Sequence, residues 1–227
     1  LREQLAGIRV VRAFVREPHE RARFARANDE ITDTSIRLGR LMAVMFPLVS
    51  RVDELQRALA LFDEIAAEEG ADRAGIEVGV MVEVPSAALA ARRFARHVDF
   101  LSIGTNDLLQ YLFAADRLLA DVAALPELFE PDVLRLIGDV CRGAHAEQAW
   151  VGVCGEAAAD PLSAAVLVGL GVDELSMTPR AVPAVKDLLR RLDSEDLERA
   201  AAEAVAADSA EAARAAVQAV VDAAMGG

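Results

Sequence analysis

Residues Leu41–Leu55, LMAVMFPLVSRVDEL, have two interpretations that lead to different fold classes. The apolar part is compatible with the start of a membrane helix. It is also compatible with a buried strand, VMFPLV, followed by a helix that begins at RVDEL. A membrane span needs about 20 apolar residues, whereas this apolar run has nine and ends at Ser50 and Arg51. We therefore expect a strand here and no membrane span.

The composition of the 227-residue chain favours a helix-rich domain with a substantial core. Hydrophobic residues make up 54% of the chain and aromatic residues only 4%. The net charge of −13 argues against nucleic acid or an anionic membrane as a partner. Cys141 and Cys154 form neither a CxxC motif nor a zinc pattern, so we expect free thiols and a cytoplasmic location.

Short apolar runs alternate with amphipathic segments from residue 44 onward. The runs are VMFPLV (44–49), IEVGVMVE (76–83), VDFLSIG (98–104), WVGVCGE (150–156) and DELSM (173–177). This alternation predicts a parallel sheet built from βα units. Five such units are visible, whereas a closed barrel needs eight. We therefore expect an α/β fold, a partial (β/α)₈ barrel of the TIM type with about five parallel strands.

The predicted domain organisation has three parts. A helical segment covers residues 1–43, the partial barrel covers 44–192, and C-terminal helices cover 193–227. Ser194 and Ser209 are the expected N-caps of the last two helices. Charge is uneven along the chain, because residues 1–50 carry a net +3 and the remainder carries −16. Such asymmetry suggests two origins for the chain.

Polar side chains follow three of the predicted strands, where α/β proteins place their active sites. Glu83 ends one run, Asn106 and Asp107 follow the next, and Cys154, Gly155 and Glu156 follow a third. Two carboxylates with room for substrate oxygens suit Mg²⁺, and a thiol with an ordinary pKa of about 8.5 can donate a proton at neutral pH. Taken singly, the acids are compatible with helix N-terminal residues and Cys154 with a small buried hydrophobe.

The motifs on these strands resemble a known family. VMFPLVSRVDEL, VGVMVEVPSAALAA, VDFLSIGTNDLLQYLFAADR, WVGVCGEAAADP and LGVDELSMTP together resemble enzyme I of the bacterial sugar phosphotransferase system, a phosphoenolpyruvate–protein phosphotransferase. The resemblance covers residues 44 to 227, the later part of the family's phosphoenolpyruvate-binding barrel. Phosphoenolpyruvate synthase shares the TND and CGE elements, and related activity on phosphoenolpyruvate or pyruvate is an alternative.

The resemblance implies a role for each matching position. Glu83 and Asp107 match the Mg²⁺ ligands, Asn106 a residue that holds the phosphate, and Arg117 an arginine that contacts the substrate. Cys154 matches the acid that protonates the enolate as pyruvate forms, with Gly155 and Glu156 beside it in the substrate site. The family also implies the phosphocarrier protein of the phosphotransferase system as a partner, and a homodimer.

Residues 1–49 resemble a different family, the cytoplasmic arm of an ABC exporter's transmembrane domain. The whole chain then reads as a chimaera joined near MFPLV. The first three barrel strands of enzyme I and its phosphohistidine domain have no counterpart in the sequence. We therefore expect weak or no transferase activity from this chain. An inactive chimaeric fragment is the alternative.

Overall fold

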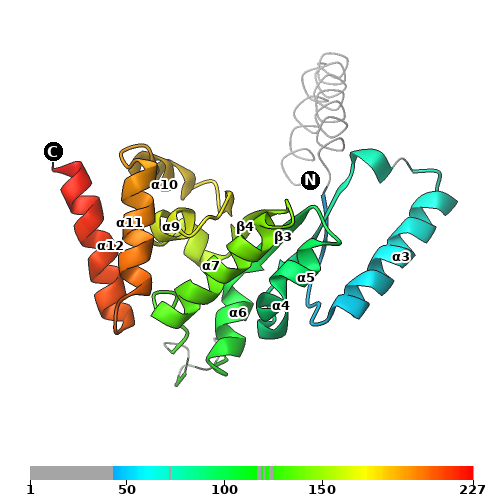
Figure 1. Cartoon of the computed structure of the whole chain (residues 1–227), viewed down its shortest axis with the longest axis horizontal. Helices are drawn as coiled ribbons and strands as arrows, with labels where there is room; N and C mark the ends of the chain where they lie inside the picture. Colours follow the sequence, from blue (N-terminus) through cyan, green and yellow to red (C-terminus); the bar gives the residue numbers. More distant parts are fainter. Residues whose placement is uncertain (1–42, 72, 117–118, 120, 123–124, 227) are drawn as a thin grey trace, which may run out of the picture. The chain divides into compact units, whose positions relative to one another are not determined.

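The computed structural model describes residues 43–71, 73–116, 119, 121–122 and 125–226 (Figure 1). The helical segment predicted for residues 1–43 lies outside the described residues except for Ala43. Residues 43–73 and those from 77 onward cluster into one compact unit, which contains the sheet and the C-terminal helices. The division predicted at residue 193 stays a prediction.

Five parallel strands form one sheet in the order β1-β2-β3-β4-β5. The strands are β1 (Ala43–Phe46), β2 (Glu77–Val82), β3 (Phe100–Gly104), β4 (Trp150–Cys154) and β5 (Glu174–Ser176). Four of them fall inside the predicted apolar runs, and β1 overlaps the first run but begins one residue before it, at Ala43. Because neighbouring strands follow one another in the chain, the order is that of consecutive strands in a (β/α)₈ barrel. The predicted α/β fold is confirmed.

The opening stretch is a strand and not a membrane helix. β1 ends at Phe46, just before Pro47, which cannot donate a backbone hydrogen bond to the ladder. Leu48 then takes a left-handed backbone conformation with φ of 52°, which turns the chain towards the next helix. Within the part of the chain that the structure describes, no helix is long and apolar enough to cross a membrane.

The sheet carries the core because its central strands are apolar on both faces. Val80, Leu101 and Val153, on three successive strands, are completely buried. The rings of Phe100 and Trp150 stack at a centroid distance of 4.5 Å on paired positions of β3 and β4. Gly79 of β2 is paired with Phe100, and a Cβ at Gly79 would lie 2.3 Å from that ring. A side chain at Gly79 would therefore displace the stack.

Helices connect the strands and continue after the last one. They are α3 (Val52–Glu68), α4 (Pro85–Leu89), α5 (Ala91–Ala95), α6 (Thr105–Leu112), α7 (Pro131–His145), α8 (Glu156–Ala159), α9 (Pro161–Gly169), α10 (Val182–Leu189), α11 (Ser194–Val205) and α12 (Ala210–Met225), with a 3₁₀ turn at Arg73–Gly75. α11 and α12 lie side by side and both contact α9 (Figure 1). The C-terminal helices therefore cover α9, and most of the residues of α9 are buried.

The caps of the last two helices agree in part with expectation. Ser209 caps α12, and its Oγ accepts a hydrogen bond from the Ala212 N–H. The prediction of Ser194 as the cap of α11 is wrong by one residue. Asp193 caps that helix instead, accepting from the Asp196 N–H at 2.8 Å. A carboxylate at this position also interacts favourably with the positive end of the helix dipole.

An ion-pair cluster joins α5 to the end of α7. Nε of Arg92 and Nε of Arg96 lie 2.7 and 3.2 Å from the same oxygen, Oε1 of Glu147. The hydrogen bond from Arg92 is the main cause that lowers the pKa of Glu147 below its ordinary 4.5, and Arg96 adds to it. A carboxyl group with a lowered folded-state pKa stabilises the fold above its unfolded-state pKa, and this contribution is lost as the pH falls through the lowered value.

Glu147→Gln is therefore expected to reduce the free energy of unfolding modestly at pH 7, and by less as the pH falls below 4.5. Urea unfolding followed by circular dichroism at several pH values measures the difference from the unmodified chain. Glu198→Gln is the control, since Glu198 is exposed and has no ion pair among the described residues. A stability difference that grew on acidification would contradict the assigned role of Glu147.

Candidate active site at the carboxyl ends of the strands

The strand register brings the predicted site segments to one edge of the sheet. Val82, the last residue of β2, is paired with Ile103, and Gly104 at the end of β3 is paired with Cys154 at the end of β4. Glu83 follows directly after Val82, so it lies at the level of Gly104 and Cys154. The clustering expected from the sequence is thus present in the backbone.

Glu83 is a buried acid at this edge, with 3% of its surface exposed. Its Oε1 accepts a hydrogen bond from the Leu48 N–H at 2.7 Å, which ties it to the turn after β1. A Cβ at Gly104 would lie 3.1 Å from the Glu83 Cβ, so the acid packs against the start of α6. Burial of a carboxylate is costly unless it is paired. No described residue donates a hydrogen bond to its second oxygen, which leaves capacity for a ligand.

Thr105, Asn106 and Asp107 form the first turn of α6 and link β3 to the end of β4. Thr105 Oγ1 donates to the Cys154 carbonyl oxygen at 2.9 Å. Asn106 Oδ1 accepts from the Glu156 N–H at 3.3 Å. Asp107 is half-buried in the same turn. Hydrogen bonds to the end of β4 and to the start of α8 therefore hold this turn in place. The Asn106 amide and the Asp107 carboxylate both lie at the N-terminal end of α6.

Gly155 allows this close approach of the two strand ends. Its φ is +108°, a conformation that residues with a Cβ rarely adopt. A Cβ there would also lie 2.6 Å from Thr105 Oγ1 and 3.0 Å from Asn106 Oδ1. The predicted role of Gly155 beside the substrate stays a prediction, but its position requires glycine.

The Cys154 thiol lies between β3 and β4 and is half-buried. Its Sγ is 3.7 Å from the Ile103 carbonyl oxygen, to which it donates, and Ser102 Oγ donates to it at 3.8 Å. Both contacts are weak hydrogen bonds of the kind that sulfur makes. They fix the direction of the thiol at the end of β4.

The two thiols are expected to differ strongly in reactivity. Burial, and then the nearby Asp173 carboxylate, raise the pKa of the Cys141 thiol to about 12. Its thiolate fraction at pH 8 is then about 10⁻⁴, and its side chain is also inaccessible. Iodoacetamide at pH 8 is expected to modify Cys154 in the folded protein, and Cys141 only after urea is added.

Peptide mass spectrometry over time measures both rates, and Cys154→Ser removes the expected fast reaction. Equal labelling of the two residues in the folded protein would show that Cys141 is more accessible than its burial indicates.

The donor set at the edge is compatible with Mg²⁺ bound together with a substrate. In the described part of the chain, no group of three or more His, Cys, Asp and Glu side chains is placed to hold a metal by itself. Mg²⁺ is commonly held by one or two carboxylates and by substrate oxygens. Glu83 and Asp107 supply two such carboxylates from adjoining segments. Arg117, the predicted substrate contact, lies outside the described residues.

A cavity of about 530 Å³ adjoins this edge. Thr105, Asn106 and Glu156 line it, and α12 contributes Arg214. The Arg214 guanidinium carbon lies 4.8 Å from the centroid of the Phe129 ring, which also lines the cavity. Sequence reasoning missed Arg214, because its alanine-rich helix carries no motif and lies far along the chain. Only the packing of α12 brings it here.

Comparison with known protein families shows which family the chain belongs to. The family described as "PEP-utilising enzyme, PEP-binding domain" matches residues 4–194, where PEP is phosphoenolpyruvate. The chain belongs to this family. The resemblance inferred from the strand-end motifs is therefore confirmed, and the residues at the sheet edge described above belong to a PEP-binding domain.

Curated relatives agree with this assignment. A phosphoenolpyruvate-protein phosphotransferase of Lactococcus lactis subsp. lactis is 45% identical over 168 residues, which is 72% of this chain and 29% of the relative. A multiphosphoryl transfer protein of Xanthomonas campestris pv. campestris is 42% identical over 214 residues, 92% of this chain and 24% of the relative. This PEP-binding domain thus spans less than a third of the length of these relatives.

A solved structure supports the fold alone. A citrate lyase from Burkholderia xenovorans LB400 superposes with a TM-score of 0.51 and 16% identity, over 81% of this chain and 63% of that chain.

The comparisons do not support a foreign N-terminal segment. The family match begins at residue 4, well inside the stretch that resembles an exporter arm. The Xanthomonas relative also aligns with 92% of the chain. Residues 1–42 themselves lie outside the described residues, so the structure does not bear on their origin.

Proposed function

We propose that this domain binds phosphoenolpyruvate with Mg²⁺ and supports transfer of the phosphoryl group to a protein histidine. The observation that carries the proposal is the convergence of Glu83, the first turn of α6 and Cys154 at one sheet edge, in a chain whose family is defined by PEP binding. The phosphocarrier protein is the proposed downstream partner, the cytoplasm the proposed location, and a homodimer the proposed assembly.

Each side chain at the edge has a proposed role. Glu83 and Asp107 hold the metal, which supplies positive charge to the phosphoryl oxygens. The Asn106 amide orients a phosphoryl oxygen. By the family resemblance, Arg117 and Glu156 also contact the substrate. As the P–O bond breaks, the phosphorus passes to a histidine nitrogen and the electron pair remains on the enolate oxygen. Cys154 gives its proton to the terminal carbon of the enolate, which forms pyruvate.

Calorimetric titration of phosphoenolpyruvate into the 227-residue chain tests the binding step. Saturable heat is expected with Mg²⁺ and none with EDTA, because two carboxylates beside a trianionic ligand repel it without a metal. Absence of binding in the presence of Mg²⁺ would overturn the proposal.

Exchange of pyruvate methyl protons with D₂O tests the proton-transfer step without an acceptor histidine. Proton NMR is expected to show Mg²⁺-dependent loss of the methyl signal with the unmodified chain. Cys154→Ala is expected to abolish this exchange and to leave phosphoenolpyruvate binding within about threefold, since the thiol acts on carbon rather than on the phosphoryl group. Undiminished exchange by Cys154→Ala would assign the proton to another group.

A further inference from the structure

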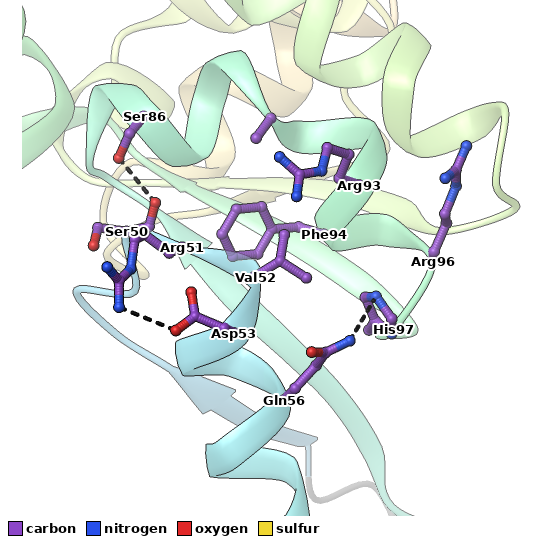
Figure 2. A pocket seen from close by; sticks show the side chains of 11 residues that line it. Ser50, Arg51, Val52, Asp53, Gln56, Ser86, Arg93, Phe94, Arg96 and His97 are labelled. Carbon is purple, nitrogen blue, oxygen red and sulfur yellow. Dashed lines mark hydrogen bonds and ion pairs between the residues drawn. The ribbon is translucent and has the colours of Figure 1, made fainter.

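A second cavity, of about 560 Å³, lies between the start of α3 and the helices α4 and α5 (Figure 2). The start of α3 forms one wall, and α4 and α5 with the turn after them form the other. Its volume is in the range of small-molecule sites. The residues that line it are Ser50, Arg51, Val52, Asp53, Gln56, Ser86, Ala90, Arg93, Phe94, Arg96 and His97. None of them is one of the residues proposed for phosphoryl transfer.

The charge of this cavity opposes that of the whole chain. Three arginines and one histidine line it against a single acid, Asp53, in a chain with a net charge of −13. Asp53 is already engaged, because Nη2 of Arg51 lies 3.0 Å from it and Nη2 of Arg57 lies 3.3 Å from it. With the histidine neutral, the lining carries a net charge of +2, and a cationic cavity in an acidic surface concentrates small anions.

Among the described residues that line this cavity, Arg93 is the arginine whose side chain is free to bind a ligand. Arg51 also pairs with Glu54, and Arg96 pairs with Glu147 outside the cavity. The side chain of Arg93 has no hydrogen bond and no ion pair among the described residues, and its backbone N–H donates to the Ala90 carbonyl oxygen. An exposed guanidinium without a partner offers five donors in a planar fork, which matches the oxygens of a phosphate or a carboxylate.

The cavity also has an apolar part. Val52 and Ala90 are partly exposed and form an apolar floor, whereas Phe94, which also borders the cavity, is fully buried behind them in the core. Figure 2 draws the Arg93, Phe94 and Val52 side chains in the same part of the cavity. A ligand that places its anionic group at Arg93 can therefore rest its apolar part on this floor.

The two serines that line the cavity, Ser50 and Ser86, already form hydrogen bonds within the protein. Ser86 Oγ donates to the Ser50 carbonyl oxygen at 3.0 Å, which joins the start of α4 to the turn before α3. Ser50 Oγ donates to Glu54 Oε2 at 2.9 Å, and Glu54 also accepts the Ser50 N–H at 3.0 Å. Because the serines already have partners, the cavity recognises its ligand chiefly through the arginine and the apolar floor.

We propose that this cavity is a binding site for a small organic oxyanion, a phosphate ester or a carboxylate with an apolar body, and that Arg93 is its principal contact. The site is separate from the candidate active site and does not depend on the function proposed for it.

Titration of phenyl phosphate, benzoate and inorganic phosphate into the 227-residue chain in EDTA tests this site. Saturable binding of phenyl phosphate or of benzoate is expected, and the stronger of the two identifies the anion class. Inorganic phosphate is expected to bind more weakly, because it cannot use the apolar floor. Arg93→Gln is expected to weaken binding about tenfold, as loss of a charged hydrogen bond does.

Arg92→Gln is the matched control. It changes the charge equally and lies on the same helix, but Arg92 pairs with Glu147 and does not line the cavity. The affinity of the Arg92→Gln variant for the organic anions is expected to equal that of the unmodified chain. The proposal is overturned if neither organic anion binds saturably, if Arg93→Gln binds as tightly as the unmodified chain, or if both variants lose affinity equally. Inorganic phosphate binding as tightly as phenyl phosphate would refute the role of the apolar floor.

Discussion

Replacing Gly169 by alanine is expected to destabilise the domain by about 2 to 4 kcal/mol, the upper range for overpacking a buried contact. Gly169 is the last residue of α9, where α11 crosses it. A Cβ at this position would lie 2.0 Å from the Leu197 carbonyl oxygen and 2.9 Å from the Ala201 Cβ. The obstructing atoms are backbone and a rigid methyl group, so α11 as a whole must move away from α9.

Urea unfolding followed by circular dichroism measures this loss. Gly138→Ala is the matched control, since Gly138 is likewise a helix residue with a neighbouring element close to it, and it is buried. There the nearest atoms to an added Cβ are the ends of flexible side chains, Arg142 Nη1 at 3.2 Å and Leu170 Cδ2 at 3.4 Å. The better helix propensity of alanine, about 1 kcal/mol, is expected to leave Gly138→Ala neutral or slightly stabilised. Equal stability of the two variants would mean that α11 is not held against α9.

The contact at Gly169 illustrates what the sequence could not predict about the fold. The five strands were predictable because each is a short apolar run between amphipathic segments, and parallel strands buried on both faces have that pattern. The packing of α11 on α9 follows from tertiary contacts between alanine-rich helices, whose patterns are compatible with many partners. The end of β1 was also missed, since the predicted run extended to Val49 whereas the strand ends at Phe46.

The candidate site was predictable to a similar extent. Strand ends that carry Glu83, Asn106 and Cys154 had to meet at one edge once the strands were parallel. The sequence did not reveal the hydrogen bonds that position them, because these come from unremarkable groups such as the Leu48 N–H and the Thr105 hydroxyl. Arg214 was missed because its proximity depends on the C-terminal helices.

Glu83→Gln is expected to weaken Mg²⁺-dependent phosphoenolpyruvate binding by about a hundredfold or more, because even residues outside the metal's immediate shell commonly cost 10- to 100-fold. Glutamine keeps the side-chain length and can still accept the Leu48 N–H at Oε1, so the turn after β1 is preserved. It removes the negative charge that the metal requires. The same substitution is expected to change the free energy of unfolding little, since it also relieves the cost of burying a carboxylate.

Calorimetry with Mg²⁺ and phosphoenolpyruvate, together with urea unfolding of each variant, separates lost binding from lost folding. Glu77→Gln is the matched control, because Glu77 lies at the opposite end of the same strand and is exposed. The control is expected to bind as the unmodified chain does. If Glu83→Gln also retains full Mg²⁺-dependent affinity, the metal is held elsewhere and Glu83 serves only to anchor the turn at Leu48. A variant that folds normally but no longer binds would place the metal at Glu83, at the end of β2, because the two substitutions remove the same charge from opposite ends of one strand.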